Sequence, residues 1–179
     1  MIIIKNFEKL AFFISIVLLL SVFSGCIGSD EDVGEDFVFT SLNGEIKHLR
    51  DYRGKVVVLD LMRVIGCDPC LYQFLELKKI SENYSNSDVV ILSIDVNIYE
   101  SAKDIQTMID KFKQQLNIEL DWVFGMDNGI IWEKYHINEP GGVPTLYIFD
   151  KNGKIYYSNE GYEPYSKLSS KIDELLKKD

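Results

Sequence analysis

The stretch GKVVVLDLM, residues 54–62, is a continuous run of β-branched and other apolar residues. Such a run is typical of a strand buried on both faces of a sheet, whereas a strand with one face in solvent alternates apolar and polar residues. The stretch DVVILSID, residues 88–95, has the same pattern. Apolar residues at helical spacing lie between the two runs. Residues 54–95 therefore predict a parallel strand–helix–strand unit.

The rest of the chain predicts further strands and helices around this unit. In chain order they are a helix at 102–116 opened by a capping box of Ser101 and Asp104, a short strand at 122–124, a short helix at 131–135, two strands at 145–149 and 154–158 joined by a tight turn, and a closing helix with an apolar face from Tyr165 to Leu175. The hairpin adds antiparallel strands to one edge. We therefore expect an α/β fold with a mixed central sheet and helices on both faces.

The N-terminal segment, residues 1–26, has a pattern of its own. An apolar run at 10–23 ends in Ser-Gly-Cys, with Cys26 last. The run is shorter than the about 20 residues of a membrane-spanning helix, and it fits a signal-peptide core followed by small residues at a cleavage site. The stretch LSVFSGC resembles a lipoprotein processing motif, with Phe23 where leucine is usual, and this implies a lipid on Cys26. The alternative is an uncleaved anchor helix beginning at Ile2.

Residues 27–36 are acidic and contain glycine, which indicates a solvated tether. We therefore expect a signal or anchor at 1–26, a tether at 27–36 and a folded domain at 37–179, anchored to the cytoplasmic membrane and facing its outer side. The formal net charge of -9 argues against binding to nucleic acid and against an electrostatic attachment to anionic lipid.

Two of the three cysteines, Cys67 and Cys70, lie just after the first predicted strand, where a helix begins. The unpaired N–H groups and the dipole of a helix N-terminus favour a negative charge, so a thiolate at Cys67 is stabilised there. Pro69 suits the first helical turn because the N–H that it lacks would have no partner. We expect Cys67 to be the exposed nucleophile and Cys70 the more buried resolving thiol.

Three other interpretations of the cysteine pair exist. A structural disulfide is possible, but so short a loop constrains the unfolded chain little. Half of a zinc site is also possible, although His48 and His136 are isolated and no second pair of ligands exists. Ordinary core cysteines do not fit the polar spacer between them. A redox-active pair is favoured because CxxC beside a strand–helix–strand pattern is typical of that chemistry.

These residues, together with GGVPTLYIFDKNGKI at 141–155, resemble the thioredoxin superfamily, and most closely its membrane-tethered, extracytoplasmic TlpA/ResA-like branch. The resemblance covers about residues 37–178. It implies that Cys67 and Cys70 are the active-site pair and that Pro144 is the cis-proline that packs against their disulfide. It also implies that the backbone of Val143 pairs with the substrate peptide.

The sequence departs from this family before the cysteines. Family members usually carry tryptophan at the position of Gly66. Their buried acid stands six residues before the first cysteine, whereas Asp60 stands seven before it, and strand alternation puts a one-residue shift on the opposite face. A loop at 63–66 that is one residue longer would place Asp60 under the pair, as a buried carboxyl of raised pKa that exchanges a proton with Cys70. The alternative is a structural carboxylate paired with lysine or arginine.

Three further features concern the activity. Gln73 stands where the ResA-like branch has glutamate, so the acid–base role of that glutamate cannot be transferred. Asp68 occupies the spacer position where strong oxidants often have histidine; it raises the energy of the thiolate and favours a reductant or a mild exchanger. Val64 and Ile65 offer an apolar docking surface in place of the missing aromatic residue.

The sequence therefore predicts a thiol–disulfide oxidoreductase that uses no cofactor and no metal. Its expected clients are disulfide-containing exported proteins, with apo-cytochrome c as one by family analogy, and a membrane electron-delivering thiol protein returns the pair to the dithiol. One rival is a non-catalytic module of the same fold that delivers copper or a client peptide, although copper carriers space their cysteines by three residues. A thiol peroxidase is the other rival, but the chain lacks the framed single cysteine of peroxiredoxins.

Overall fold

A computed structural model gives the fold of residues 34–135 and 142–177. In chain order these residues form β1 (Val38–Ser41), β2 (Ile46–His48), the 3-10 helix η2 (Leu49–Tyr52), β3 (Val56–Met62), α2 (Asp68–Asn83), β4 (Val89–Asp95), α3 (Ala102–Leu116), β5 (Val123–Met126), α4 (Ile130–Tyr135), β6 (Thr145–Phe149), β7 (Ile155–Glu160) and α5 (Tyr165–Leu176). The predicted signal or anchor segment, Cys26 included, lies outside the described residues. Among those described, no helix is long and apolar enough to cross a membrane.

Seven strands form one mixed sheet in the order β2-β1-β5-β4-β3-β6-β7. Strands β3, β4 and β5 are parallel, and the other pairings are antiparallel. The strand–helix–strand unit predicted for residues 54–95 is present, with Asp60 opposite Ser93 in the pairing of β3 and β4. The predicted hairpin is β6–β7, and β6 lies on the other side of β3. The strand that leads to the cysteines is therefore enclosed between two neighbours.

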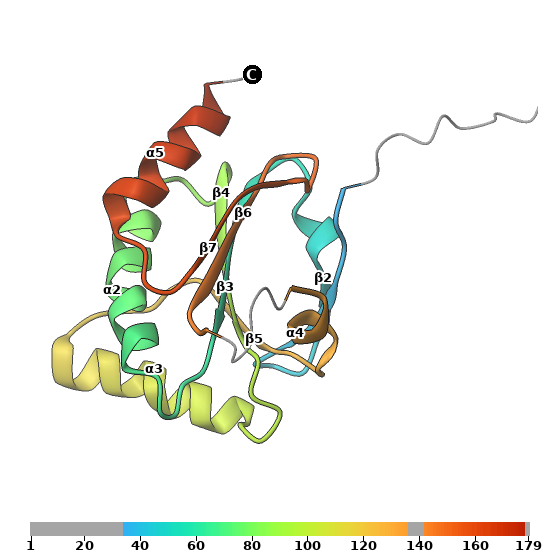
Figure 1. Ribbon diagram of the computed structural model, residues 1–179. Coiled ribbons are helices and arrows are strands. Elements are labelled where there is room, and N and C mark those ends of the chain that lie inside the picture. The colour runs from blue at the N-terminus through green and yellow to red at the C-terminus, as the bar shows by residue number, and fades with distance from the viewer. Residues whose placement is uncertain (1–33, 136–141, 178–179) are drawn as a thin grey trace, which may run out of the picture. The chain divides into compact units, whose positions relative to one another are not determined.

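Helices cover both faces of the sheet, as the pattern predicted: α2, α3 and α5 lie on one side and α4 on the other (Figure 1). Each side has its own apolar cluster. The first includes Phe74 of α2, Phe112 of α3 and Ile172 of α5, and the second includes Ile131 of α4 and Leu49 of η2. Burial of these side chains is the main source of stability for such a fold.

Strand β3 sends alternate side chains to the two clusters. Val56, Val58 and Met62 belong to the cluster under α2, whereas Val57, Leu59 and Leu61 belong to the opposite cluster. All seven residues of β3 are buried. A strand covered on both sides carries no polar face, and this is why its sequence is a continuous apolar run.

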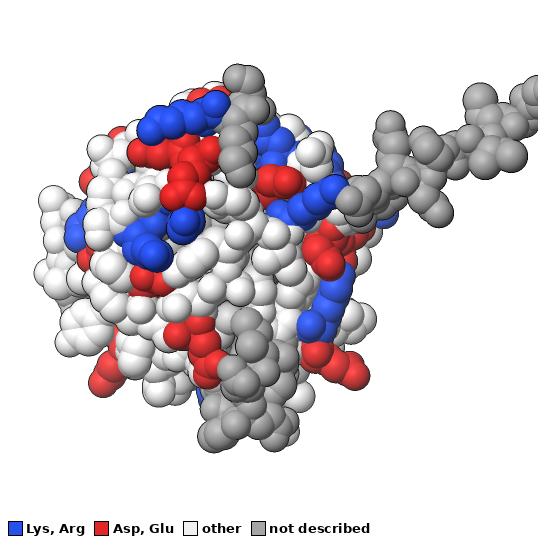
Figure 2. All heavy atoms as spheres, turned by 45° about the horizontal axis from the view of Figure 1, so that its top comes forward, with Lys and Arg blue, Asp and Glu red and all other residues white. Residues whose placement is uncertain are grey.

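The sequence pattern did not predict β1 and β2, which form the edge of the sheet beyond β5. It also assigned Glu35 to the tether, yet this residue contacts the domain: its N–H donates to the Gly153 carbonyl over 2.8 Å, Arg53 donates to its carbonyl over 2.5 Å, and its carboxylate pairs with Lys134. On the face shown in Figure 2, acidic and basic side chains are interspersed rather than gathered by sign.

Candidate active site

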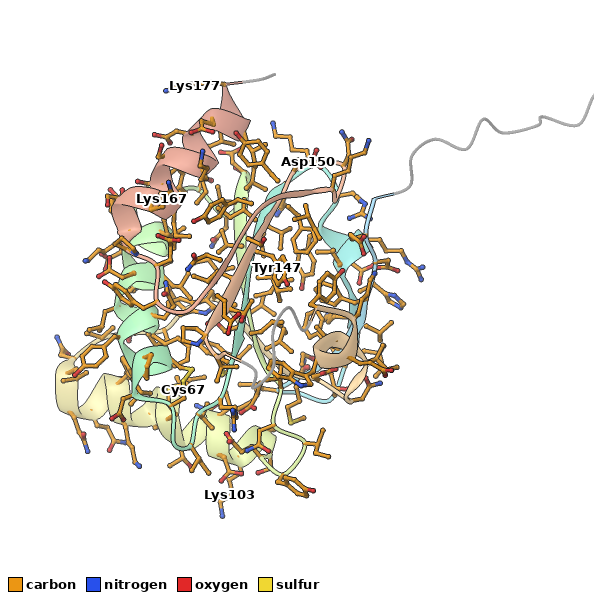
Figure 3. All side chains as sticks on the ribbon, viewed as in Figure 1. Cys67, Lys103, Tyr147, Asp150, Lys167 and Lys177 are labelled. Atoms are coloured by element: carbon orange, nitrogen blue, oxygen red, sulfur yellow. A yellow bond between two sulfur atoms is a disulfide. The ribbon has the colours of Figure 1, made fainter. Side chains whose placement is uncertain are left out.

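The two cysteines of the CxxC motif form a disulfide at the start of α2, at the opposite end of the sheet from Asp150 (Figure 3). Cys67 caps the helix: the N–H of Cys70 donates to Cys67 Sγ over 3.2 Å. Pro69 occupies the first turn, where its missing N–H removes no hydrogen bond. Cys67 is 7% exposed and Cys70 is not exposed. The expectation of an exposed Cys67 is therefore wrong for the oxidised protein, where both cysteines are buried, and Cys67 is only the more exposed of the two.

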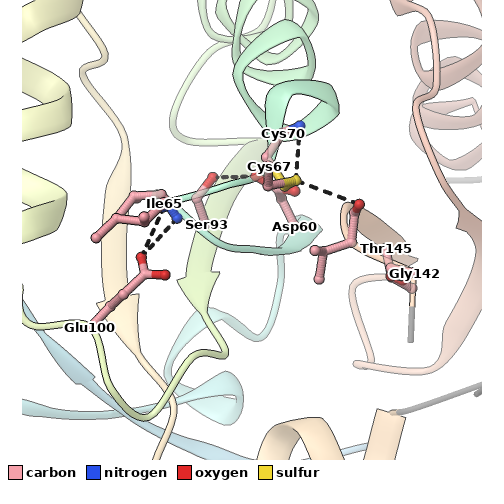
Figure 4. Close-up of a disulfide and its surroundings, with 10 residues drawn as sticks. Asp60, Ile65, Cys67, Cys70, Ser93, Glu100, Gly142 and Thr145 are labelled. Atoms are coloured by element: carbon pink, nitrogen blue, oxygen red, sulfur yellow. Dashed lines mark hydrogen bonds between the residues drawn. A yellow bond between two sulfur atoms is a disulfide. The ribbon is translucent and has the colours of Figure 1, made fainter. Parts of the chain in front are cut away.

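The loop before β6 lies against this disulfide. The Val143–Pro144 peptide bond is cis, the isomer that the resemblance implies, and the Val143 carbonyl oxygen lies 3.5 Å from Cys67 Sγ (Figure 4). A disulfide sulfur has no proton, so this is a contact in the oxidised protein, and the Cys67 thiol formed on reduction has a hydrogen-bond acceptor there. The Thr145 hydroxyl donates to a carbonyl of the same loop over 2.5 Å, which fixes the loop beside the sulfur.

Asp60 lies on the face of β3 that carries the cysteines. Its neighbours at alternate positions, Val58 and Met62, belong to the same apolar cluster as Cys67 and Cys70. Because side chains alternate along a strand, Asp60 points to that face as well, and Figure 4 draws it below the disulfide. The loop between β3 and α2 is thus long enough to compensate for the one-residue shift in the sequence.

Burial dominates the electrostatics of Asp60, which is 0% exposed. The Ser93 hydroxyl donates to Asp60 Oδ2 over 2.8 Å, and the Trp122 indole N–H donates to that hydroxyl over 3.0 Å. Burial raises the pKa of Asp60 to about 7, and the Ser93 hydrogen bond opposes this rise. In the described part of the chain no donor reaches Asp60 Oδ1 and no lysine or arginine pairs with the group. The alternative of a structural ion pair therefore has no partner there.

Gln73 is held by the backbone and not by the sulfurs. Its side chain is 0% exposed; its amide nitrogen donates to the Glu163 carbonyl over 3.1 Å, and its amide oxygen accepts the Glu163 N–H over 2.8 Å. These two bonds connect α2 to the segment before α5. An acid–base role is excluded for a primary amide, so Gln73 is a structural residue of the site.

Gly66 explains the missing aromatic residue before the first cysteine. Its φ is +74°, a backbone conformation that side chains with a Cβ rarely adopt. Nothing lies within 4 Å of a Cβ built there, so the backbone rather than crowding requires glycine. The position has no tryptophan because the loop turns through a left-handed conformation immediately before Cys67.

A groove of about 560 Å³ opens beside this loop, between α2 and α3. Val64 and Ile65 line its end near the cysteines, and Leu71, Met108 and Phe112 are among the residues that line its apolar wall further along. Ile65 is 61% exposed. The predicted apolar surface in front of Cys67 is thus one end of a larger groove, which sequence spacing alone did not indicate.

The histidines take no part in this site as far as the structure describes them. His48 Nδ1 lies 3.4 Å from Asp36 Oδ2, and His136 lies outside the described residues. Among the residues that are described, no group of three or more histidine, cysteine or acidic side chains is arranged to hold a metal ion.

Two features define a thioredoxin-like fold here. A helix that begins with a CxxC disulfide follows the central strand β3, and a cis-proline precedes β6, the antiparallel neighbour of that strand. The comparison with protein families agrees with this class. The chain belongs to the AhpC/TSA family, whose model matches residues 31–158.

Thiol-disulfide oxidoreductases are among the sequence relatives of this chain. The thiol-disulfide oxidoreductase ResA of Geobacillus kaustophilus is 28% identical over 120 residues, which cover 67% of this chain and 63% of that protein, a little less than two thirds of its length. ResA of Bacillus cereus is 24% identical over 182 residues that cover 96% of each chain. Among solved structures, the pneumococcal exposed lipoprotein thioredoxin Etrx1 of Streptococcus pneumoniae superimposes on this chain with a TM-score of 0.62 and 23% identity. The superposition covers 79% of this chain and 100% of Etrx1.

Proposed function

We propose that this protein is a thiol–disulfide oxidoreductase that acts on disulfide-containing exported proteins. The observation that carries the proposal is the Cys67–Cys70 disulfide at the N-terminus of α2, with Cys67, the more exposed of the two cysteines, beside the Val143 carbonyl. A purely structural disulfide needs neither a cis-proline loop against it nor a buried carboxyl on the same face of the sheet. The names of the relatives, thiol-disulfide oxidoreductase, support the same activity.

The proposed reaction begins with the dithiol form. The Cys67 thiolate attacks one sulfur of the client disulfide; that disulfide breaks, one client thiolate leaves, and a mixed disulfide forms. Cys70 then loses its proton and attacks Cys67 Sγ, which releases the second client thiolate. Two electrons pass to the client, and the protein is left with the Cys67–Cys70 disulfide of the structure.

Asp60 is the proposed proton acceptor for Cys70. Because Cys70 is 0% exposed, its proton has no direct path to water. Asp60 lies on the same face of β3, and burial raises its pKa to about 7. A carboxyl with such a pKa can both accept and return a proton near neutral pH, which is what a reversible exchange requires.

We also propose that the protein is anchored by a lipid on Cys26 and faces the outside of the cytoplasmic membrane. A membrane electron-delivering thiol protein would return its disulfide to the dithiol, because an exterior compartment lacks the cytoplasmic thiol reductants. The acidic spacer residue Asp68 supports a reductant or a mild exchanger over a strong oxidant. Cytochrome c biogenesis is one process that needs such a reductant, and the suggestion rests on family analogy.

Insulin reduction tests the activity, with dithiothreitol as the electron donor. The wild-type protein is expected to accelerate precipitation of the insulin B chain, and Cys67→Ser and Cys70→Ser are expected to fall to the rate of dithiothreitol alone. Cys26→Ser, which removes the third cysteine, is the matched control and should keep the acceleration. Full activity in Cys67→Ser would contradict the proposal. So would tight Cu(I) binding or peroxide turnover by a protein that does not reduce insulin.

Trapping in cells tests the client class. In Cys70→Ser the mixed disulfide on Cys67 cannot be resolved, so exported proteins should accumulate as dithiothreitol-sensitive adducts. The double variant Cys67→Ser, Cys70→Ser is the control and should form none. Adducts composed of cytoplasmic proteins alone would refute the proposed location.

A further inference from the structure

The loop in front of Cys67 is held by a carboxylate from another part of the chain. The backbone N–H groups of Val64 and Ile65 both donate to Glu100 Oε2, over 2.9 and 3.2 Å (Figure 4). Glu100 belongs to the segment between β4 and α3, and it is 36 residues from Val64. Hydrogen bonds from N–H groups to a carboxylate are charge-assisted and stronger than bonds between neutral groups. Glu100 therefore fixes the position of a loop that has no helix or strand structure of its own.

Glu100 in turn is linked through Asn97 to a second, buried carboxyl. Asp95, at the end of β4, is 2% exposed, and its Oδ1 accepts the N–H of Asn97 over 2.8 Å. Asn97 also donates its side-chain amide to Glu100 Oε1 over 2.6 Å. No donor within the described residues reaches Asp95 Oδ2, and the Glu100 carboxyl is one of the groups that raise the pKa of Asp95. Two carboxyl groups can form a hydrogen bond only when one of them carries a proton.

Burial, followed by the hydrogen bond and the charge of Glu100, raises the pKa of Asp95 to about 8. The Asp95 carboxyl therefore keeps its proton up to about pH 8. Loss of this proton leaves a negative charge on Asp95 beside the Glu100 carboxyl, which opposes close contact between the two groups.

Within the described part of the chain, no nearby cation neutralises Asp95 in place of a proton. On β3, Met62 lies opposite Asp95, and the next residue, Arg63, is exposed. Beyond β5, Asp127 directs its carboxylate to the N–H groups of Ile131 and Trp132, over 2.9 and 2.8 Å. On α3, Asp104 accepts hydrogen bonds from Ser101 at the start of the helix. Among the described residues, no lysine or arginine is one of the main groups that shift the pKa of Asp95.

The loop that Glu100 fixes is also the one that a client meets. Val64 and Ile65 form the end of the groove nearest the cysteines, and Gly66 then turns the chain into Cys67. A client disulfide that approaches Cys67 from this groove would therefore meet the Val64–Ile65 loop.

We propose that Glu100 is a positioning residue, which holds the Val64–Ile65 loop in the arrangement that accepts a client beside Cys67, and that the buried Asp95, joined to Glu100 through Asn97, holds Glu100 in place. This inference rests on the proposed oxidoreductase function. It assigns to the pair no contact with the client and no part in the exchange of electrons. Loss of the loop's position should weaken the binding of clients and leave the chemical steps at the sulfurs intact.

Amide hydrogen exchange in the oxidised protein tests the structural half of the inference without any need for activity. At pH 7, the amides of Val64 and Ile65 are expected to exchange at least about tenfold faster in Glu100→Ala than in the wild type, the factor that corresponds to the net contribution of one hydrogen bond. Glu82→Ala, which removes an exposed carboxylate near the other end of α2, is the matched control. Equal exchange in Glu100→Ala and the wild type would overturn the inference, whatever the activity of the protein.

Steady-state kinetics with a reducible client test the functional half. Glu100→Ala is expected to raise KM by about tenfold at pH 7, with kcat within about twofold of the wild type. Between pH 7 and pH 9 the KM of the wild type should rise relative to that of Asp95→Asn, because the asparagine amide donates to Glu100 at every pH. Parallel pH profiles of these two proteins, or a fall in kcat without a change in KM in Glu100→Ala, would overturn the inference. If neither the wild type nor any variant reduces insulin, the proposed function fails. The amide hydrogen exchange experiment then still decides whether Glu100 holds the loop.

Discussion

The buried carboxyl under the disulfide makes the stability of this protein depend on pH in a predictable direction. Burial raises the pKa of Asp60 from 3.8 to about 7. Between these two values the folded protein holds a proton that the unfolded chain has released. The free energy of unfolding therefore falls as the pH rises through this window, with the contribution of Asp60 complete below about pH 4 and lost above about pH 7.

The size of the effect follows from the same two pKa values. Each unit of difference corresponds to about 1.4 kcal/mol, and integration between pH 5 and pH 8 gives a loss of about 2–3 kcal/mol in the free energy of unfolding. Asp60 is fully buried, so solvent does not screen this contribution. In Asp60→Asn the amide has no proton to lose. All other titrating groups, Asp95 included, are shared by the two proteins and cancel in the difference.

Urea unfolding of the oxidised protein between pH 5 and pH 8 measures this difference, because disulfide-bonded cysteines do not titrate. The wild type should lose about 2–3 kcal/mol more than Asp60→Asn over this range. Asp88→Asn is the matched control because this side chain is exposed, and its profile should parallel the wild type. Parallel profiles for wild type and Asp60→Asn, or a wild type that gains stability with rising pH, would refute the reasoning.

Three further predictions concern the residues around the site. Ser93→Ala removes the hydroxyl that favours the ionised form of Asp60. The pH range over which the free energy of unfolding falls should therefore move upward by about one pH unit, and no movement or a downward one would contradict this. Gln73→Ala removes both bonds to the backbone before α5 and should lower the free energy of unfolding by about 2–3 kcal/mol, whereas Gln114→Ala on the exposed side of α3 should change it little. Gly66→Ala should be destabilising by about 1 kcal/mol in the same assay, although no atom is near the added methyl group; a stabilised variant would show that the left-handed backbone is not required.

The central elements were predictable because their sequence patterns depend on local burial. β3 and β4 are covered on both faces, and a strand in that position needs apolar residues throughout. The edge strands β1 and β2 were missed because both are short and β2 has no fully buried residue. Such strands are defined by the neighbour with which they pair, and a single sequence does not show that neighbour.

The residues of the site also fall into those that the sequence predicted and those that it did not. The cysteine pair and Pro144 were recognisable from motifs, since each depends on residues adjacent in the chain. The contact between Glu100 and the N–H groups of Val64 and Ile65 joins segments that are 35 and 36 residues apart, and the bonds of Gln73 span 90 residues. A side chain that bonds to a distant backbone N–H leaves no mark on the sequence of its partner, because every residue except proline offers that donor.

The distribution of charge around the sulfurs bears on the direction of the reaction. A strong thiol oxidant stabilises its thiolate, and so its reduced form, with nearby positive charge or hydrogen bonds. Here the spacer residue Asp68 is an exposed acid, and a buried carboxyl, Asp60, lies on the face of β3 that carries the pair. When Asp60 is ionised it opposes a second negative charge on Cys70, so removal of the Cys70 proton and protonation of Asp60 are coupled. The helix N-terminus is then the main stabilising influence on the Cys67 thiolate. A dithiol with so little stabilisation gives up its electrons readily, which supports a reductant or a mild exchanger as the proposed role.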